Sequence, residues 1–419
     1  MTAAILALNE RTFASLRRHR NYRLFFVGQV VSVSGSWMQN VALAWLVIQL
    51  SPSPLALGAL AFFRFIPFTI FGLFAGTVAD RVDNRKLVMA TQATSMALSA
   101  ALAVVALSNH APLWLVYTLA ALTGTATVFD APGRQALTFQ MVGRDELPNA
   151  VALNSSLFNA SRVIGPAIAG VLIAAVGVGA CFAVNAVTFL AVLASLAMMR
   201  PEELYAVKRK EVPPTIFRGT REGLAYAARN ENVRLVLFLV TIVASVGFNF
   251  HVILPLLASQ TLETGPEVFG LLSAVFGLGA LTGALVAAGI ARASWKVLLL
   301  GTGGFSVALL ALAPLASVAA CSVLLFLVGV AFTTWTANAN SILQLNVPDH
   351  LRGRVLALYL WAFAGLAPVG GMLAGWLADI GGTELSFAVS GVTGLAVTGI
   401  VGLRLQALRS TKSAPVSLA

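Results

Sequence analysis

The sequence predicts an all-α membrane protein in which twelve transmembrane helices form two six-helix bundles related by a pseudo-twofold axis along the membrane normal. Three observations predict this class. The 419-residue chain is 58% hydrophobic and 10% charged, whereas about a quarter of the residues are charged in soluble domains. Its long uncharged stretches hold segments of about 20 residues, the length that spans a bilayer as a helix. Its basic residues gather in alternate breaks between these segments.

Turn-forming Pro, Gly, Asn and Ser residues divide the apolar stretches into twelve expected spans. The first apolar run follows basic residues, as in a signal peptide, but it continues from Leu24 to Leu50 without a cleavage site. We therefore expect it to be a retained helix. The expected spans are 22–50, 54–80, 87–108, 112–133, 147–175, 178–199, 233–259, 267–291, 296–315, 317–341, 353–380 and 384–405.

The lysines and arginines distinguish the two sides of the expected membrane. Of these 27 residues, all except Arg64 and Arg162 fall in the two tails or in every second break between spans. Since loops rich in Lys and Arg stay in the cytoplasm, we expect a multi-pass protein of the cell (inner) membrane with both termini cytoplasmic. The net charge of +11 therefore reflects topology, and we expect the lipid bilayer but no nucleic acid as a partner.

One long polar segment divides the chain into equal halves. We expect a cytoplasmic segment at 1–21, a six-helix bundle at 22–199, a cytoplasmic linker at 200–232, a second bundle at 233–405 and a cytoplasmic tail at 406–419. Residues 140–153 and 344–357 occupy the same place in the two halves and match at four of fourteen positions. Such internal repetition is typical of transporters.

The loop after the second span, "GTVADRVDNRK", resembles the signature G-x-x-x-D-R-x-G-R-[RK] of the major facilitator superfamily. Asp83 and Asn84 depart from it, and the matching residues are Gly76, Asp80, Arg81 and Arg85. The resemblance implies that Asp80 pairs with the start of the eleventh span, near Gly353, and holds the transporter closed toward the cytoplasm. A basic loop without a gating role is the alternative.

The end of the fourth span, "FDAPGRQALTFQ", places Asp130 and Arg134 one helical turn apart, and we expect Pro132 and Gly133 to break the helix between them. With the following stretch "ELPNAVALNSSLFNASRVIGPAIAG", this pattern resembles the branch of the superfamily that contains enterobactin exporters and macrolide efflux pumps. Asp130 is the only acid well inside an expected span, so it is a candidate proton carrier. The alternative is an ion pair with Arg81, Arg85 or Arg134.

Within the fifth span, Gly165 and Pro166 resemble the glycine–proline part of the superfamily's export-associated motif, of form G-P-x-x-G-G. The resemblance implies antiport. The alternative is a packing kink unrelated to the direction of transport.

Polar residues form stripes at helical spacing on four expected spans. Because polar stripes facing lipid are costly, we expect them to face a central cavity; hydrogen bonds between helices are the alternative. The stripes include Ser155, Asn159, Arg162 and Pro166; Gln29, Ser32, Ser36 and Asn40; Thr241, Ser245 and Asn249; and Thr334, Asn338 and Ser341. The expected cavity residues are Ser36, Asn40, Arg64, Ser155, Asn159, Arg162, Asn249 and Asn338.

Arg64, in "AFFRFIPF", is a cation near the middle of the second span, where insertion costs roughly 2.5–3.5 kcal/mol. The expected partners are carbonyls freed near Pro67, polar side chains of other spans, water or substrate. We expect Gly72 and Gly76 to pack against another helix. His251 is the only membrane-buried histidine and could carry protons; a hydrogen-bonded packing residue is the alternative.

These features favour a secondary exporter of small amphipathic molecules (siderophore-like, phenolic or macrolide-like) that works by alternating access with proton antiport. Two buried arginines against one buried acid favour anionic or phenolic substrates. The alternatives are an uptake symporter of an organic anion, a receptor with a transporter fold and a membrane-embedded enzyme.

The sequence offers no chemistry for an enzyme, a cofactor or a metal site. It lacks the common nucleotide-binding, zinc-binding and serine-nucleophile motifs. Cys181 and Cys321 lie in apolar segments, so we expect buried thiols and no disulfide. We expect a monomer without a cofactor.

Overall fold

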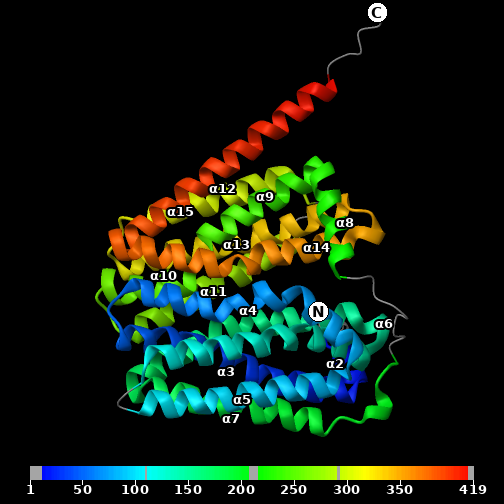
Figure 1. Cartoon of the computed structure of the whole chain (residues 1–419), viewed down its shortest axis with the longest axis vertical. Helices are drawn as coiled ribbons and strands as arrows, with labels where there is room; N and C mark the ends of the chain where they lie inside the picture. Colours follow the sequence, from blue (N-terminus) through cyan, green and yellow to red (C-terminus); the bar gives the residue numbers. More distant parts are fainter. Residues whose placement is uncertain (1–11, 109–110, 207–215, 290–292, 414–419) are drawn as a thin grey trace, which may run out of the picture.

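The structure is a computed structural model that describes residues 12–108, 111–206, 216–289 and 293–413. Nearly all of these residues are helical, and no strand occurs among them. Ten helices of the described residues are long and apolar enough to cross a membrane. Figure 1 shows these long helices packed side by side.

The helices fall into two groups along the chain. The first group is α2 (Ala14–Arg18), α3 (Arg20–Leu50), α4 (Pro54–Arg81), α5 (Asn84–Leu107), α6 (Leu113–Val176) and α7 (Val178–Ala197). The short η1 (Pro201–Glu203) and α8 (Ile216–Arg229) follow. The second group is α9 (Glu231–Gly247), α10 (Phe250–Leu256), the π-helix η2 (Leu257–Thr261), α11 (Pro266–Gly289), α12 (Trp295–Leu312), α13 (Val318–Asn346), α14 (Asp349–Leu360), the π-helix η3 (Trp361–Gly365) and α15 (Ala367–Ser413).

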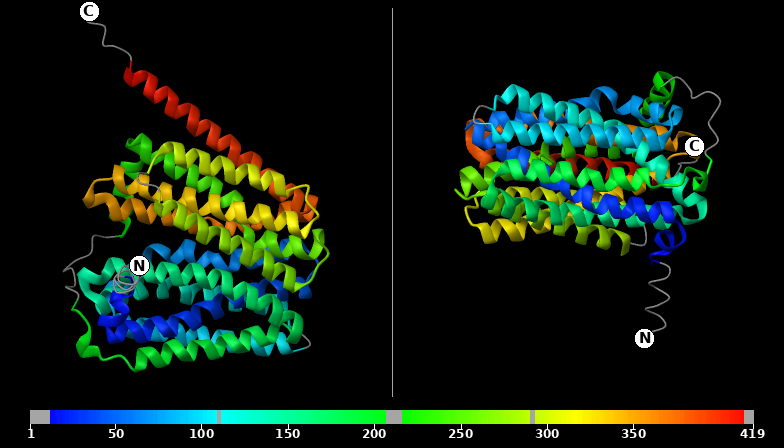
Figure 2. Two further views of the ribbon diagram at one scale, coloured as in Figure 1. Left: turned by 180° about the vertical axis from the view of Figure 1, so that it is seen from behind. Right: turned by 90° about the horizontal axis from the view of Figure 1, so that it is seen from below.

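The two groups lie next to each other in space. In Figures 1 and 2 the blue-to-green helices of the first group, α3 to α7, and the green-to-red helices of the second, α9 to α15, occupy different sides of the molecule. Helices α4 and α6 of the first group pack against α15 and α11 of the second. We call the end of the helices where α7 ends and α9 begins the linker end, and the other end the far end.

The two longest helices bend back at glycines. Gly143 interrupts α6 with φ of 70°, and Gly382 interrupts α15 with φ of 68°, beside the non-helical Gly381. Positive φ strongly favours glycine because it lacks a Cβ. The expected break at Pro132 is wrong, since α6 keeps helical dihedrals through this residue and the chain turns at Gly143 instead.

Side-chain caps explain two features of the loop between α4 and α5. Asp83 accepts a hydrogen bond from the backbone N–H of Lys86 at 3.1 Å, so it is the N-cap of α5. The N-cap role accounts for an aspartate at position 83, where the superfamily signature has glycine. Arg85 donates to the carbonyls of Leu196 (2.8 Å) and Ala197 (3.2 Å), where it satisfies the free acceptors at the end of α7.

The two groups touch closely at the far end. A Cβ added to Gly58 of α4 would lie 3.0 Å from the carbonyl oxygen of Gly371 in α15. The Ser53 hydroxyl donates to an Asp379 carboxylate oxygen at 3.0 Å. Trp45 stacks on Phe269 with 6.1 Å between ring centroids. These contacts join α3 and α4 to α11 and α15.

The linker end of α4 is open. An added Cβ at Gly72 or Gly76, or at Gly353 in α14, would have no atom of the described residues within 4 Å apart from the backbone of its own helix. The expected close packing of Gly72 and Gly76 is therefore absent from this structure. Asp80 and Arg81 are exposed, and Asp80 has no ion pair within the described ranges.

Candidate functional site

A cavity of about 450 Å³ lies between the two groups of helices. Helices α3 to α7 supply most of its lining, and the break between α9 and α10 together with α10 and α11 supplies the rest. Its volume falls in the range of small-molecule sites, roughly 300–1,000 Å³. Three arginines and one acid line it: Arg64, Arg134, Arg162 and Asp130.

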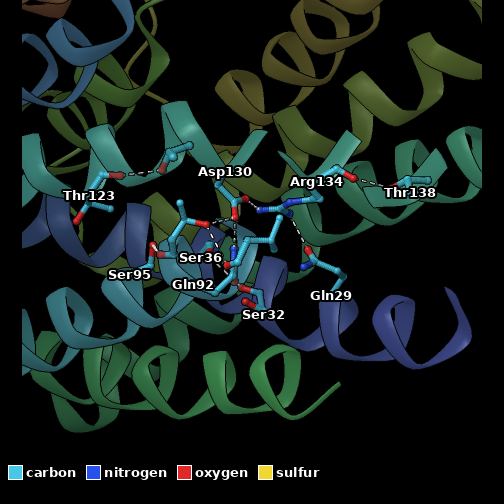
Figure 3. Close-up of polar contacts among 12 residues, drawn as sticks. Gln29, Ser32, Ser36, Gln92, Ser95, Thr123, Asp130, Arg134 and Thr138 are labelled. Carbon is cyan, nitrogen blue, oxygen red and sulfur yellow. Dashed lines mark hydrogen bonds and ion pairs between the residues drawn. The ribbon is translucent and has the colours of Figure 1, made fainter. Parts of the chain in front are cut away.

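Asp130 is the centre of a buried polar network (Figure 3). It is 3% exposed and forms an ion pair with Arg134. Its other carboxylate oxygen accepts hydrogen bonds from the Thr91 hydroxyl at 2.7 Å and the Gln92 amide at 2.9 Å. Arg134 also donates to Gln29 at 2.6 Å. The carboxylate is therefore held by one cation and two neutral donors.

This network identifies the ion-pair partner among those the sequence suggested. Arg134 pairs with Asp130, whereas Arg85 caps α7 and Arg81 is exposed at the end of α4. The pair forms because α6 is continuous through Pro132, which leaves the two side chains one turn apart on one face. Opposite charges held this closely cancel one another inside the cavity.

Arg64 contacts a polar side chain of another helix. Its guanidinium donates to the Asn40 side-chain oxygen of α3 at 2.5 Å and lies 5.6 Å from the centroid of the Phe65 ring. His251 packs its ring against the same Phe65 at 5.0 Å. The buried Nε2 atom of His251 has no hydrogen-bond partner within the described chain. Arg64 has no ion pair with any described residue.

Arg162 lies among aromatic rings. Its guanidinium carbon is 4.6 Å from the centroid of Phe276, 5.7 Å from Trp37 and 5.8 Å from Phe332. Attraction between a cation and the face of a ring stabilises such contacts. No ion pair or hydrogen bond of its side chain occurs among the residues that the structure describes. Its hydrogen-bond donors are thus available to the cavity.

Gly165 allows α6 to approach α3 beside this arginine. A Cβ at this position would lie 2.5 Å from the Trp37 Cβ atom and 2.7 Å from the carbonyl oxygen of Ser34. A side chain here would displace the ring that faces Arg162. Pro166, the next residue, lines the cavity.

The structure brings half of the expected cavity residues together. Ser36, Asn40, Arg64 and Arg162 line the cavity. The other four lie outside its lining. Ser155 is exposed, and its carbonyl accepts a hydrogen bond from the Asn159 side chain. Asn249 donates to the carbonyls of Ser245 and Val246. Asn338 exchanges hydrogen bonds with the backbone of Ser294. In the conformation described, these four residues do not line this cavity, and their place in a central cavity stays a prediction.

Aromatic lining residues are the main feature that the sequence analysis missed. The chain is non-helical at Phe248 and Asn249, and this break directs Phe248, Phe250 and His251 to the cavity. Gly247 and Asn249 are turn-forming residues inside an apolar run, and they were the available signal. Trp37, Phe65, Phe68, Phe158, Phe189, Phe269 and Phe276 complete the aromatic lining.

Metal and disulfide chemistry have no basis in the described residues. No group of three or more His, Cys, Asp or Glu side chains within them could hold a metal ion. Cys181 and Cys321 are free thiols here, and both are buried.

The comparison with protein families decides the class. Residues 10–418 match the family described as transmembrane secretion effector. The chain belongs to this family of the major facilitator superfamily. The predicted superfamily is thereby confirmed, and so is the expectation that the protein is a transporter and no enzyme.

Curated relatives align along almost the whole chain. The staphyloferrin A transporter of Staphylococcus aureus is 26% identical over 90% of this chain and 94% of its own length. Macrolide efflux protein A of Streptococcus pyogenes is 22% identical over 90% and 95%. The multidrug efflux pump Tap of Mycolicibacterium fortuitum is 27% identical over 92% and 96%.

Solved structures show the same fold. The nucleoside transporter NupG superposes with a TM-score of 0.73 at 11% identity, covering 91% of this chain and 99% of that one. A POT family transporter superposes with the same score at 11% identity, covering 92% and 96%. These superpositions show the fold alone. The family match and the curated relatives show that the protein is a multi-pass secondary transporter of the major facilitator class.

Proposed function

We propose that the protein exports small anionic or phenolic molecules by alternating access, in exchange for protons. The cavity between the two helix groups carries this proposal, because it contains two arginines that form no ion pair with a described residue and a third that Asp130 neutralises. Relatives named for macrolide and multidrug efflux support the direction of transport. Gly165 and Pro166, which match the export-associated motif, support it further.

The proposed architecture has twelve spans in two six-helix bundles, at 22–199 and 233–405. The turns at Gly143 and at Gly381–Gly382 divide two of the ten long helices into two spans each. The basic loops of the linker end favour a cytoplasmic location for this end and for both termini. We propose that a monomer in the cell membrane is the working unit.

In this arrangement we propose that the conformation described is the state open toward the cytoplasm. Contacts such as Ser53 to Asp379 close the far end, while Gly76 and Gly353 have open space at the linker end. We propose that the two bundles rock until Asp80 approaches the start of α14 near Gly353. Arg81 remains beside it, and Arg85 stays on the end of α7.

Asp130 is the proposed proton carrier. Taking up one proton neutralises the carboxylate and breaks its ion pair with Arg134, and losing that proton restores the pair. We propose that the protonated form permits the return of the empty carrier. His251 is the second candidate, because its Nε2 atom is buried without a hydrogen-bond partner in the described chain.

Uptake by symport of an organic anion is the second candidate function, and one observation favours it. Protonation of Asp130 would leave Arg134 as an additional unpaired cation in the cavity. This cation would strengthen the binding of an anion to the protonated form, so that the proton and the anion would travel together. The direction of the proton gradient that drives accumulation distinguishes export by antiport from uptake by symport.

Inside-out membrane vesicles test the proposal. With an acidic lumen, we expect labelled salicylate and a labelled catecholate to accumulate and the cationic dye ethidium not to accumulate. The Asp130→Asn variant should lose accumulation driven by the gradient but keep the exchange of labelled for unlabelled substrate. Asp349→Asn, which changes an exposed acid paired with Arg352, is the matched control. Accumulation that needs the opposite gradient would show symport instead.

A further inference from the structure

Two of the cavity arginines contact consecutive turns of α3. The Arg162 guanidinium faces the ring of Trp37, and the Arg64 guanidinium donates to Asn40. Residues three apart on a helix have Cβ atoms about 5–6 Å apart on one face. The two cationic side chains therefore approach neighbouring positions of one helix face, and both line the same cavity.

No acid of the lining compensates these two charges. Asp130 is the only acidic residue there, and its carboxylate is paired with Arg134. Neither Arg64 nor Arg162 has an ion pair with a described residue. Cations removed from water are costly unless they are paired. A ligand that supplies two negative charges to this cavity would satisfy both.

The surroundings of the two arginines differ in chemistry. Around Arg162 the contacts are the rings of Trp37, Phe276 and Phe332, which suit a flat apolar body. A guanidinium without hydrogen-bond partners can bind a carboxylate through two parallel hydrogen bonds. Around Arg64 the neighbours include polar groups, the Asn40 amide and the His251 ring that shares Phe65 with it.

We propose that Arg162 and Arg64 form a two-point site for an aromatic diacid. One carboxylate of the ligand binds Arg162, and the flat ring of the ligand packs against the aromatic side chains around this arginine. The second acidic group of the ligand binds Arg64 beside Asn40. This inference rests on the proposed function, because it assigns the substrate class of the same cavity. It adds that two acidic groups on one flat molecule are recognised together.

Equilibrium binding to the purified full chain in a neutral maltoside detergent tests the site. The probes share one ring system and differ in acidic groups: naphthalene-2,6-dicarboxylate, 2-naphthoate and dimethyl naphthalene-2,6-dicarboxylate. Since a hydrogen bond to a charged group contributes enough for about a tenfold change in affinity or more, we expect each carboxylate to tighten binding by about this factor. Equal affinity for the three probes would overturn the proposal.

Variants assign each carboxylate to an arginine. Arg162→Gln and Arg64→Gln should each weaken diacid binding about tenfold and leave the affinity for the dimethyl ester unchanged. Arg234→Gln removes an exposed cation outside the cavity and should change neither. If a thermal melt shows that a glutamine variant is not folded, Arg64→Lys and Arg162→Lys, which keep the charge, replace it in the binding experiment. Diacid affinity that is the same in all variants would show that the arginines do not bind it.

The binding experiment is independent of the transport experiment. Binding of the diacid that requires both arginines, without any transport driven by a gradient, would support the site and contradict export. Transport of salicylate or a catecholate driven by an acidic lumen, without binding of the diacid, would contradict the site and leave export standing.

Discussion

Asp130 and Arg134 depend on each other for their burial. Removing one member of a buried pair leaves the other charge without compensation, which costs about 3–5 kcal/mol. Because a third of the Arg134 side chain is exposed (33%), we expect Arg134→Gln to lower the free energy of unfolding by about 3 kcal/mol, the low end of that range. Adding Asp130→Asn should recover most of the loss. Chemical unfolding of the single and double variants in detergent measures both effects.

The control for this prediction is an exposed pair. Arg200 pairs with Glu203 at 3.0 Å, with both side chains well exposed, and such pairs contribute about 0–1 kcal/mol. Arg200→Gln should therefore change the free energy of unfolding by less than about 1 kcal/mol. Additive losses in the double variant of Asp130 and Arg134 would contradict their mutual dependence.

The sequence predicted contacts within one helix better than contacts between helices. Asp130 and Arg134 are four residues apart, so helical spacing alone suggested their pair. The partner of Arg64 is Asn40, on a different helix, and no local spacing relates the two. Apart from the break that Gly247 and Asn249 signal, the aromatic lining was not predictable either, because phenylalanines that face lipid and phenylalanines that face a cavity have the same hydropathy.

At the scale of helices, the contrast between Gly165 and Gly72 gives a second prediction. An added Cβ at Gly165 would lie within 2.7 Å of atoms of α3, whereas Gly72 has no neighbour within 4 Å. Gly165→Ala should destabilise the protein by about 1–3 kcal/mol through overpacking. Gly72→Ala should stabilise it by about 0.5–1 kcal/mol, since alanine is the better helix former. Thermal unfolding of the two matched variants measures the difference.

A reversed order of these two stabilities would contradict the packing of α3 against α6. Gly165→Ala should also weaken binding of an aromatic carboxylate, because displacement of Trp37 alters the ring that faces Arg162. Gly72→Ala should leave this binding unchanged in the conformation described, since Gly72 does not line the cavity.

The positions of the helices followed from hydropathy, but their ends and breaks did not. Long apolar stretches determine where a span can lie, and most expected spans overlap the observed helices. Proline was a poor guide: α6 continues through Pro132 and turns at Gly143, where a positive φ is needed. The break at Phe248 and Asn249 contains no proline, and the tertiary contacts that stabilise it, such as Ser390 donating to the Val246 carbonyl at 2.8 Å, come from another helix.

In the whole molecule, the two helix groups are joined at the far end and lie apart at the linker end of α4. A cross-link tests whether transport requires the two groups to rock about the far end. The Ser53 hydroxyl and the Asp379 carboxylate are 3.0 Å apart. This contact makes the two positions suitable for a pair of cysteines, since a disulfide needs Cα atoms within about 7 Å. The native Cys181 and Cys321 are buried, which reduces competing reactions. Oxidation of the Ser53→Cys/Asp379→Cys variant should hold the far end closed.

If transport requires the two groups to rock, the oxidised variant should lose net transport and recover it after treatment with a reductant. Its binding of ligand from the linker end should persist, because the cavity residues are not changed. Gly76→Cys/Gly353→Cys is the matched pair at the linker end. No neighbouring atom lies within 4 Å of either position, so this pair should not cross-link in the conformation described and should cross-link only as the linker end closes. Full transport by the oxidised far-end variant would contradict rocking, since this mechanism cannot deliver substrate past an end that stays shut.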